Sequence, residues 1–233
     1  MPESELVTLD DLKKTDPTFD LKPVNRGAYK LYFNKLIDHL DAEGPKDMEA
    51  LSSIDSIFVK AEAIVSPRSR LNQYIAECKD FDLVTIQAGD VVRLTDLGSK
   101  YASRSDRSGE INDQQADLLL SYVKEKLLRE DKGTILAILG FVSAVRELSK
   151  NKYPVPEKEI QSYFIHKVGK STEWIAPSTI KDQTSYFGQY AQQLRLVVRT
   201  DEGKYHLTRE GLILSLLHDL ARVSTGLSQI ASI

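Results

Sequence analysis

The chain lacks cysteine pairs and long apolar runs, and each absence removes a class of protein. Its single cysteine, Cys78, excludes an internal disulfide framework and a cysteine-rich zinc site, and it fits a reducing cytoplasm. No apolar run approaches the roughly 18 residues that span a bilayer. The polar, acidic opening "MPESELVTLDDLKKTD" is unlike a signal peptide. We therefore expect a cytoplasmic protein that does not associate with a membrane.

The chain also lacks the strong positive charge that is typical of many nucleic-acid-binding proteins, since its net charge is −3. The acidic excess lies near the start. Residues 1–65 hold 8 basic and 13 acidic side chains, a net of −5, and residues 66–233 hold 23 and 21, a net of +2. The later part of the chain therefore has room for a local basic face.

Motifs for catalysis and phosphate binding are missing as well. The sequence contains neither G-x-x-x-x-G-K-[ST] nor G-x-G-x-x-G, and no two of its four histidines have the spacing of a ligand pair. Two E-x-K strings occur, Glu77-Cys78-Lys79 in a predicted helix and Glu202-Gly203-Lys204 in a predicted turn. Because a metal site needs carboxylates held on rigid elements, we predict no metal, no cofactor, no catalytic residue and no enzymatic activity.

The chain does contain an internal repeat. The segments "LVTIQAGDVVRLT" (83–95) and "LVVRTDEGKYHLT" (196–208) align without a gap, and Gly98 and Gly211 follow at the same distance. Each segment predicts two strands around a turn, followed by a helix that a threonine caps. The glycine is expected in the first turn of that helix, or where two backbones approach closely.

Helical patterns precede each repeated segment. They lie at 27–42, 45–61 and 66–80 before the first, and at 133–150, 155–169 and 177–194 before the second. Three helices followed by a hairpin form the order of a winged helix. The sequence therefore predicts a mainly α fold with small β wings (α+β), built of tandem winged helix-turn-helix domains joined by a helical connector.

The expected boundaries follow from this pattern. They are an acidic N-terminal extension at 1–25, a first winged-helix domain at 26–107, a helical connector at 108–132 and a second winged-helix domain with a C-terminal helix at 133–233. We expect residues 114–233 to form a self-contained unit, and the C-terminal helix to span about 209–224. The predicted core includes Ile135, Leu139, Val142, Ile160, Phe164, Phe187 and Leu194.

The order of these patterns, with "VRLTDLG" followed by polar residues and then "QADLLLSYV", resembles the DNA-recognition half of type IIS restriction endonucleases such as FokI. The similar stretch spans roughly 68–211. That resemblance implies the winged-helix recognition module. It does not imply cleavage, because those enzymes carry a separate nuclease domain for which this chain has no room.

In a DNA-bound winged helix the third helix enters the major groove, and the wing contacts backbone or minor groove. Arginine can read guanine, and asparagine or glutamine can read adenine, by paired hydrogen bonds. The DNA-binding candidates are Arg68, Arg70, Asn72, Gln73 and Arg93 in the first unit and Thr179, Lys181, Gln183, Ser185, Gln189 and Lys204 in the second. The same residues also suit an ordinary solvated helix face, and Glu77, Asp80 and Asp182 count against dense phosphate contact.

Two classes of function stay open. The first, which we favour, is a non-catalytic, sequence-specific DNA-binding protein: a regulator, or the recognition subunit of a defence or mobile-element system. Its expected partners are double-stranded DNA and another protein subunit. The alternative is a protein-interaction scaffold similar to the tandem winged-helix subunits of SMC–kleisin complexes, which are often acidic. A homodimer is compatible with both.

Overall fold

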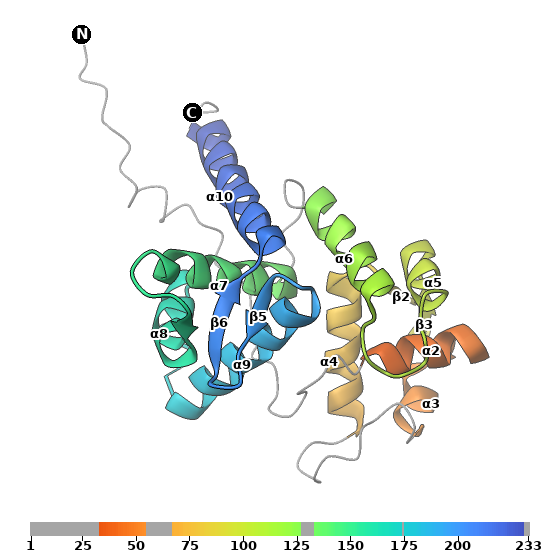
Figure 1. The fold of residues 1–233 in the computed structure, drawn as a ribbon. Coiled ribbons are helices and arrows are strands. Elements are labelled where there is room, and N and C mark those ends of the chain that lie inside the picture. Colours follow the sequence, from red (N-terminus) through yellow and green to blue (C-terminus); the bar gives the residue numbers. More distant parts are fainter. Residues whose placement is uncertain (1–32, 55–66, 127–132, 174, 231–233) are drawn as a thin grey trace.

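The computed structural model describes residues 33–54, 67–126, 133–173 and 175–230. Helices predominate, and two small three-stranded antiparallel sheets lie apart from each other (Figure 1). The architecture is therefore mixed α+β and mainly helical, as the sequence predicts. None of the described helices combines the length and the apolar character that crossing a membrane requires.

The first half of the described chain runs helix, strand, two helices, hairpin and helix. Its elements are α2 (Phe33–Glu43), β1 (Lys46–Asp47), α3 (Met48–Ser52), α4 (Pro67–Asp80), β2 (Val84–Gln87), β3 (Val91–Leu94) and α5 (Asp96–Ala102). The sheet has the order β1-β3-β2, so the short strand between α2 and α3 pairs with the hairpin.

The second half repeats this order after the connecting helix α6 (Asp113–Lys126). Its elements are α7 (Gly133–Ser149), β4 (Val155–Pro156), α8 (Glu157–Lys167), α9 (Pro177–Gln193), β5 (Val197–Arg199), β6 (Lys204–Leu207) and α10 (Arg209–Ile230). The sheet order β4-β6-β5 matches that of the first half. Each hairpin pairs with itself, as the two strands around a turn predict, and also with a short strand of its own half that the sequence did not predict.

The repeated Leu-Thr-x-x-Gly motif makes the same junction twice. Thr95 and Thr208 each accept a hydrogen bond from the glycine three residues on, at 2.9 and 3.0 Å. A side-chain methyl on Gly98 would overlap the Leu83 carbonyl oxygen, and one on Gly211 would overlap that of Leu196. Both glycines therefore permit the close backbone approach that the sequence predicted, since only a residue without Cβ fits there.

Several element boundaries differ from the predicted ones. Two-residue strands, β1 and β4, stand at the start of segments predicted as helices, because two residues are too few to show a strand's alternation. Helix α10 continues to Ile230, beyond the predicted end near 224. The predicted extension at 1–25, parts of the predicted helices at 27–32 and 55–61, and the end of the predicted connector at 127–132 lie outside the described residues.

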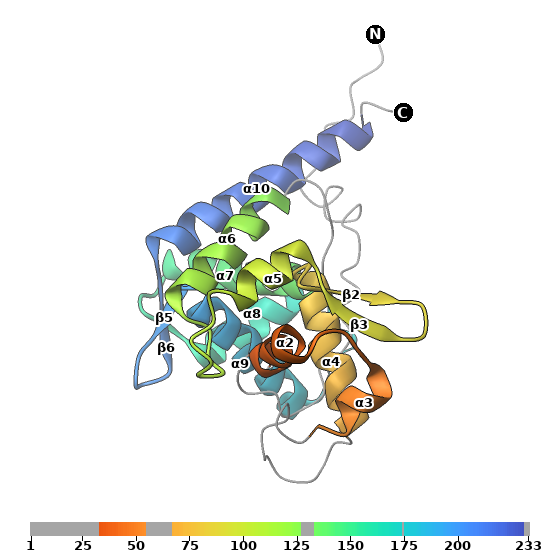
Figure 2. The ribbon, with the colours of Figure 1, turned by 90° about the vertical axis from the view of Figure 1, so that its right-hand side faces the viewer.

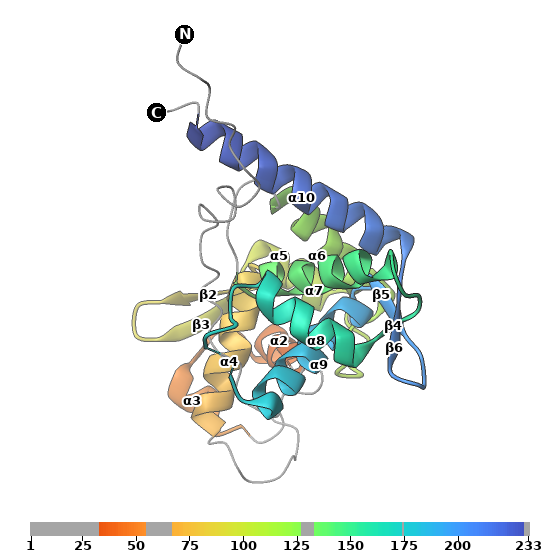
Figure 3. The same ribbon diagram turned by 90° about the vertical axis from the view of Figure 1, so that its left-hand side faces the viewer.

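One buried apolar cluster runs through both halves, and it contains all seven predicted core residues. The halves meet where α4 packs against α7, and where the Phe81 ring stacks on the Tyr190 ring with 6.2 Å between centroids. Whether residues 114–233 fold alone stays a prediction, but in the chain they share their core with the first half. Helix α10 lies along one edge of the molecule, and its C-terminal end extends past α6 and α7 (Figures 2 and 3).

Candidate nucleic-acid interface

Helix α4 presents one line of residues outward from the first half. It begins at Pro67, whose fixed φ suits a first helical turn, and its apolar side packs into the core. The exposed line is Arg68, Asn72, Ala76 and Lys79, at spacings of four, four and three residues. Among the residues that the structure describes, Arg68 and Lys79 form no ion pair. This line is a helix face with one amide and two cations that have no acidic partner in the described part of the chain.

The other two candidates on α4 are less accessible. The Arg70 side chain is half-buried. The amide nitrogen of Gln73 is buried, and its side chain lies near enough to Glu77 to act on the pKa of that carboxyl. Gln73 is therefore half-buried and not exposed as expected, because it lies one turn before the buried Glu77 on the same side of the helix.

The β2–β3 hairpin carries the exposed cation Arg93. Its register pairs Arg93 with Thr85, and both side chains lie on the outer side of the sheet, whereas Val84 and Val92 are buried on the other. The wing follows α4 directly, so Arg68 lies about 18 Å along the helix axis from the end where the hairpin starts. Arg93, like Arg68, has no ion-pair partner among the described residues.

The candidates on α9 are mostly covered. Lys181 is exposed, and Thr179, Ser185 and Gln189 are half-buried. Gln183 is only 3% exposed, so the expectation that it lies on the exposed side of the helix is wrong. The physical reason is its position one turn before Phe187, on the helix side that packs into the core.

The cations of the second hairpin are engaged by acidic neighbours. The Lys204 ammonium lies 2.5 Å from a carboxylate oxygen of Glu202, and the Arg199 guanidinium lies 2.9 Å from Glu157. These pairs lower the free positive charge at β5–β6. Arg93 of the first hairpin, in contrast, has no ion-pair partner among the described residues.

A buried polar cluster joins α4 to α9, and sequence reasoning missed it. The hydroxyls of Tyr186 and Tyr190 both donate hydrogen bonds to the Glu77 carboxylate, and all three side chains are buried. Burial raises the pKa of the Glu77 carboxyl to about 7, although the tyrosine hydrogen bonds lower it in part. A signal was present: Glu77 lies on the apolar side of its helix beside Cys78, and the two tyrosines are four residues apart.

The two E-x-K strings lie in different surroundings. The sequence analysis counted Glu77 as a surface carboxylate that would repel phosphate, but Glu77 is buried against Tyr186 and Tyr190. Glu202 lies in the exposed turn between β5 and β6. No group of three or more histidine, cysteine or acidic side chains within the described ranges could hold a metal ion. Cys78 is buried, and burial raises the pKa of its thiol.

Among the described residues, the outward line of α4 together with Arg93 on the adjoining hairpin forms an accessible polar surface of the predicted kind. The equivalent line of α9 (Lys181, Ser185, Gln189 and Gln192) is exposed or half-buried, whereas Tyr186 and Tyr190 of α9 face α4. Comparison of the chain with protein-family models, with curated proteins and with solved structures finds no match.

Proposed function

We propose that the two halves are winged helices and that the chain is a non-catalytic DNA-binding protein that contacts double-stranded DNA through its first half. Each half has the helix, strand, helix, helix, hairpin order of such a module, with the same sheet order. The chain would act as a regulator, or as the recognition subunit of a defence or mobile-element system whose catalytic part is another protein.

The outward line of α4 is the observation that carries this proposal. Arg68 and Asn72 lie in the first two turns of the helix, which are the turns that meet base edges when a recognition helix enters the major groove. Their side chains can read guanine and adenine. The N-terminal end of a helix also favours phosphate, because its free N–H groups and dipole are positive.

The second half would take a supporting role. Its recognition helix buries Gln183 and uses Tyr186 and Tyr190 to bind Glu77 of the first half. That side of α9 is held against the first half, and the outward line of α9 offers one cation, Lys181, and no arginine. We therefore propose one DNA-reading helix in each chain, and we propose that the second half contacts the other protein subunit.

Duplex binding tests the proposal directly. Fluorescence anisotropy with mixed-sequence and candidate 30-bp duplexes, at about 50 and 200 mM salt, measures affinity and its salt dependence. We expect Arg68→Ala with Asn72→Ala to weaken binding to the preferred sequence by about tenfold or more, since each base-reading pair contributes about 1–3 kcal/mol. Arg93→Ala should weaken all sequences alike and reduce the salt slope by about one.

The matched control is Lys158→Ala, which removes an exposed positive charge from α8 of the second half. It should leave affinity within about twofold of the parent chain. If the Arg68→Ala, Asn72→Ala chain remains folded by circular dichroism and binds like the parent, α4 does not read DNA. Loss of binding on Lys181→Ala instead would move the site to α9.

A protein-interaction scaffold is the second candidate, and the neutralised cations of the β5–β6 hairpin favour it. The same titrations separate the two functions. A parent chain that binds no duplex at low salt contradicts DNA binding and leaves the scaffold.

A further inference from the structure

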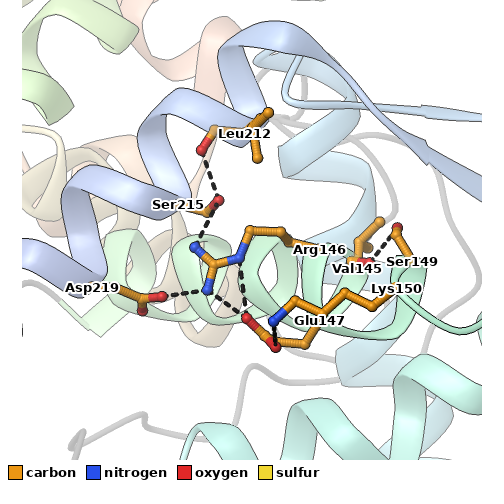
Figure 4. Close-up of polar contacts among 8 residues, drawn as sticks. All are labelled: Val145, Arg146, Glu147, Ser149, Lys150, Leu212, Ser215 and Asp219. Carbon is orange, nitrogen blue, oxygen red and sulfur yellow. Dashed lines mark hydrogen bonds and ion pairs between the residues drawn. The ribbon is translucent and has the colours of Figure 1, made fainter.

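The rotation of α10 about its axis is held by an ion-pair network on α7 (Figure 4). The Arg146 guanidinium donates hydrogen bonds to the Asp219 carboxylate and to Ser215 Oγ, the latter at 3.4 Å. It also pairs with Glu147 at 2.7 Å, and Lys150 binds the other oxygen of Glu147 at 2.6 Å. Because Asp219 and Ser215 lie one turn apart, these bonds turn one defined side of α10 toward α7.

The side turned inward carries both polar and apolar residues. Ser215 and His218 are buried along with Leu214 and Ala221. The side turned outward carries large apolar residues that are 37–65% exposed: Leu212, Ile213, Leu216, Leu217, Leu220 and Val223. An amphipathic helix of a monomer normally buries its leucines and exposes its polar residues. The six exposed apolar residues, which we name the α10 stripe, form a continuous patch of the kind that marks an interaction surface.

The spacing of the stripe matches a coiled-coil contact surface. Ile213, Leu216, Leu220 and Val223 recur at intervals of three, four and three residues. The sequence continues the interval at Leu227 and Ile230, still within the 22 residues of α10. A helix of this length is about 33 Å long. Apolar residues at alternating intervals of three and four are the a and d positions through which helices pair.

No other described helix offers a matching surface to cover this stripe in the same chain. Within the described ranges, the remaining exposed large apolar side chains are scattered singly: Ile86, Tyr153, Tyr163, Ile175 and Val198. The outward a and d side of α10 therefore fits the α10 of another copy, and two identical stripes can pair about a two-fold axis.

Charge and area agree with a second copy. The acidic residues nearest the stripe are compensated within the chain, Asp219 by Arg146 and Glu210 by Lys124 at 2.8 Å, so two copies would not repel. Aromatic side chains bury about 150–250 Å² each, and the six aliphatic residues of the stripe are somewhat smaller. At 37–65% exposure they leave roughly 500 Å² per copy and about 1,000 Å² for two, which is the lower limit for a specific interface.

We propose that two copies of this chain associate through the α10 stripe, with the a and d residues of one helix packed between those of the other. The interface buries the apolar side chains that a single chain leaves in water. This inference goes beyond DNA binding and does not depend on it.

Sedimentation equilibrium of the full chain, over about 1–100 μM, tests the association. The parent should approach twice its 26.2 kDa mass. Leu216→Glu with Leu220→Glu places four charges in the contact and should raise the dimer dissociation constant by at least about 100-fold. The uncharged pair Leu216→Gln with Leu220→Gln serves as a second variant, and circular dichroism verifies that each chain is folded.

Val198→Glu is the matched control, because Val198 is exposed to a similar degree but lies on β5, away from the stripe. It should leave the dimer intact. A parent chain that is a monomer at 100 μM would overturn the proposal, whether or not it binds another protein or a lipid surface. A dimer that survives both folded double variants would overturn it equally.

Discussion

Replacing Glu77 with glutamine should change how the stability of the protein depends on pH. The carboxyl lies in the interior, where it accepts hydrogen bonds from Tyr186 and Tyr190. Burial raises its pKa from 4.5 to about 7, and the hydrogen bonds from Tyr186, Tyr190 and Gln73 oppose that rise only in part. The folded chain therefore holds a proton on Glu77 in a pH range where the unfolded chain has released it.

The sign of the effect follows from that difference. Between about pH 4.5 and pH 7 the folded state binds more protons than the unfolded state, so the free energy of unfolding falls as pH rises. The bound proton stabilises the folded state fully below about pH 4.5, and this stabilisation disappears as the pH rises from 4.5 past about 7. With 1.36 kcal/mol per pKa unit, the loss is about 3 kcal/mol.

Glu77→Gln keeps the shape of the side chain but cannot ionise. Its amide can accept a hydrogen bond from one tyrosine and donate one to the other. We expect the free energy of unfolding of the variant, relative to the parent, to increase by about 2–3 kcal/mol between pH 5 and pH 8. Urea denaturation followed by circular dichroism at each pH measures this difference.

Two further variants check the reasoning. Tyr190→Phe removes one donor to the carboxylate, so the pH at which stability is lost should move upward. Glu125→Gln, an exposed glutamate on α6, should reproduce the pH profile of the parent. If the parent and Glu77→Gln chains show parallel profiles between pH 5 and pH 8, Glu77 does not hold a proton in the folded state.

Three shorter predictions concern the junctions and the absence of catalysis. Gly98→Ala or Gly211→Ala should each lower the free energy of unfolding by about 3 kcal/mol, because the added methyl overlaps a backbone oxygen that cannot move away. Ser99→Ala, an exposed neighbour in the same helix, should stay within about 0.5 kcal/mol of the parent by the same urea titration. The purified chain should not cut plasmid DNA with magnesium or manganese; cleavage that is lost on Glu202→Ala would contradict this.

The repeat and its consequences could be predicted from the sequence because they rest on local interactions. The junction between hairpin and helix depends on a capping threonine and the glycine three residues after it. Because both copies of the repeat contain this pair, the sequence predicts the same junction at Thr95–Gly98 and at Thr208–Gly211. The apolar patterns of α7 and α9 likewise predicted their buried residues. The helix order and the self-paired hairpins follow from these short-range patterns.

Only the tertiary structure decided which side of each helix is covered. Periodicity reports which residues share a side, but it does not say what lies against that side. The sequence places Gln73 among the exposed residues of its helix. The structure shows that Glu77, one turn later on the same side, is buried against tyrosines 109 and 113 residues away. Helix α10 has apolar residues on two sides, and the contact of Asp219 with Arg146, 73 residues away, holds Leu214 inward and the stripe outward. These contacts join distant segments, so their free energies depend on packing that no local pattern contains.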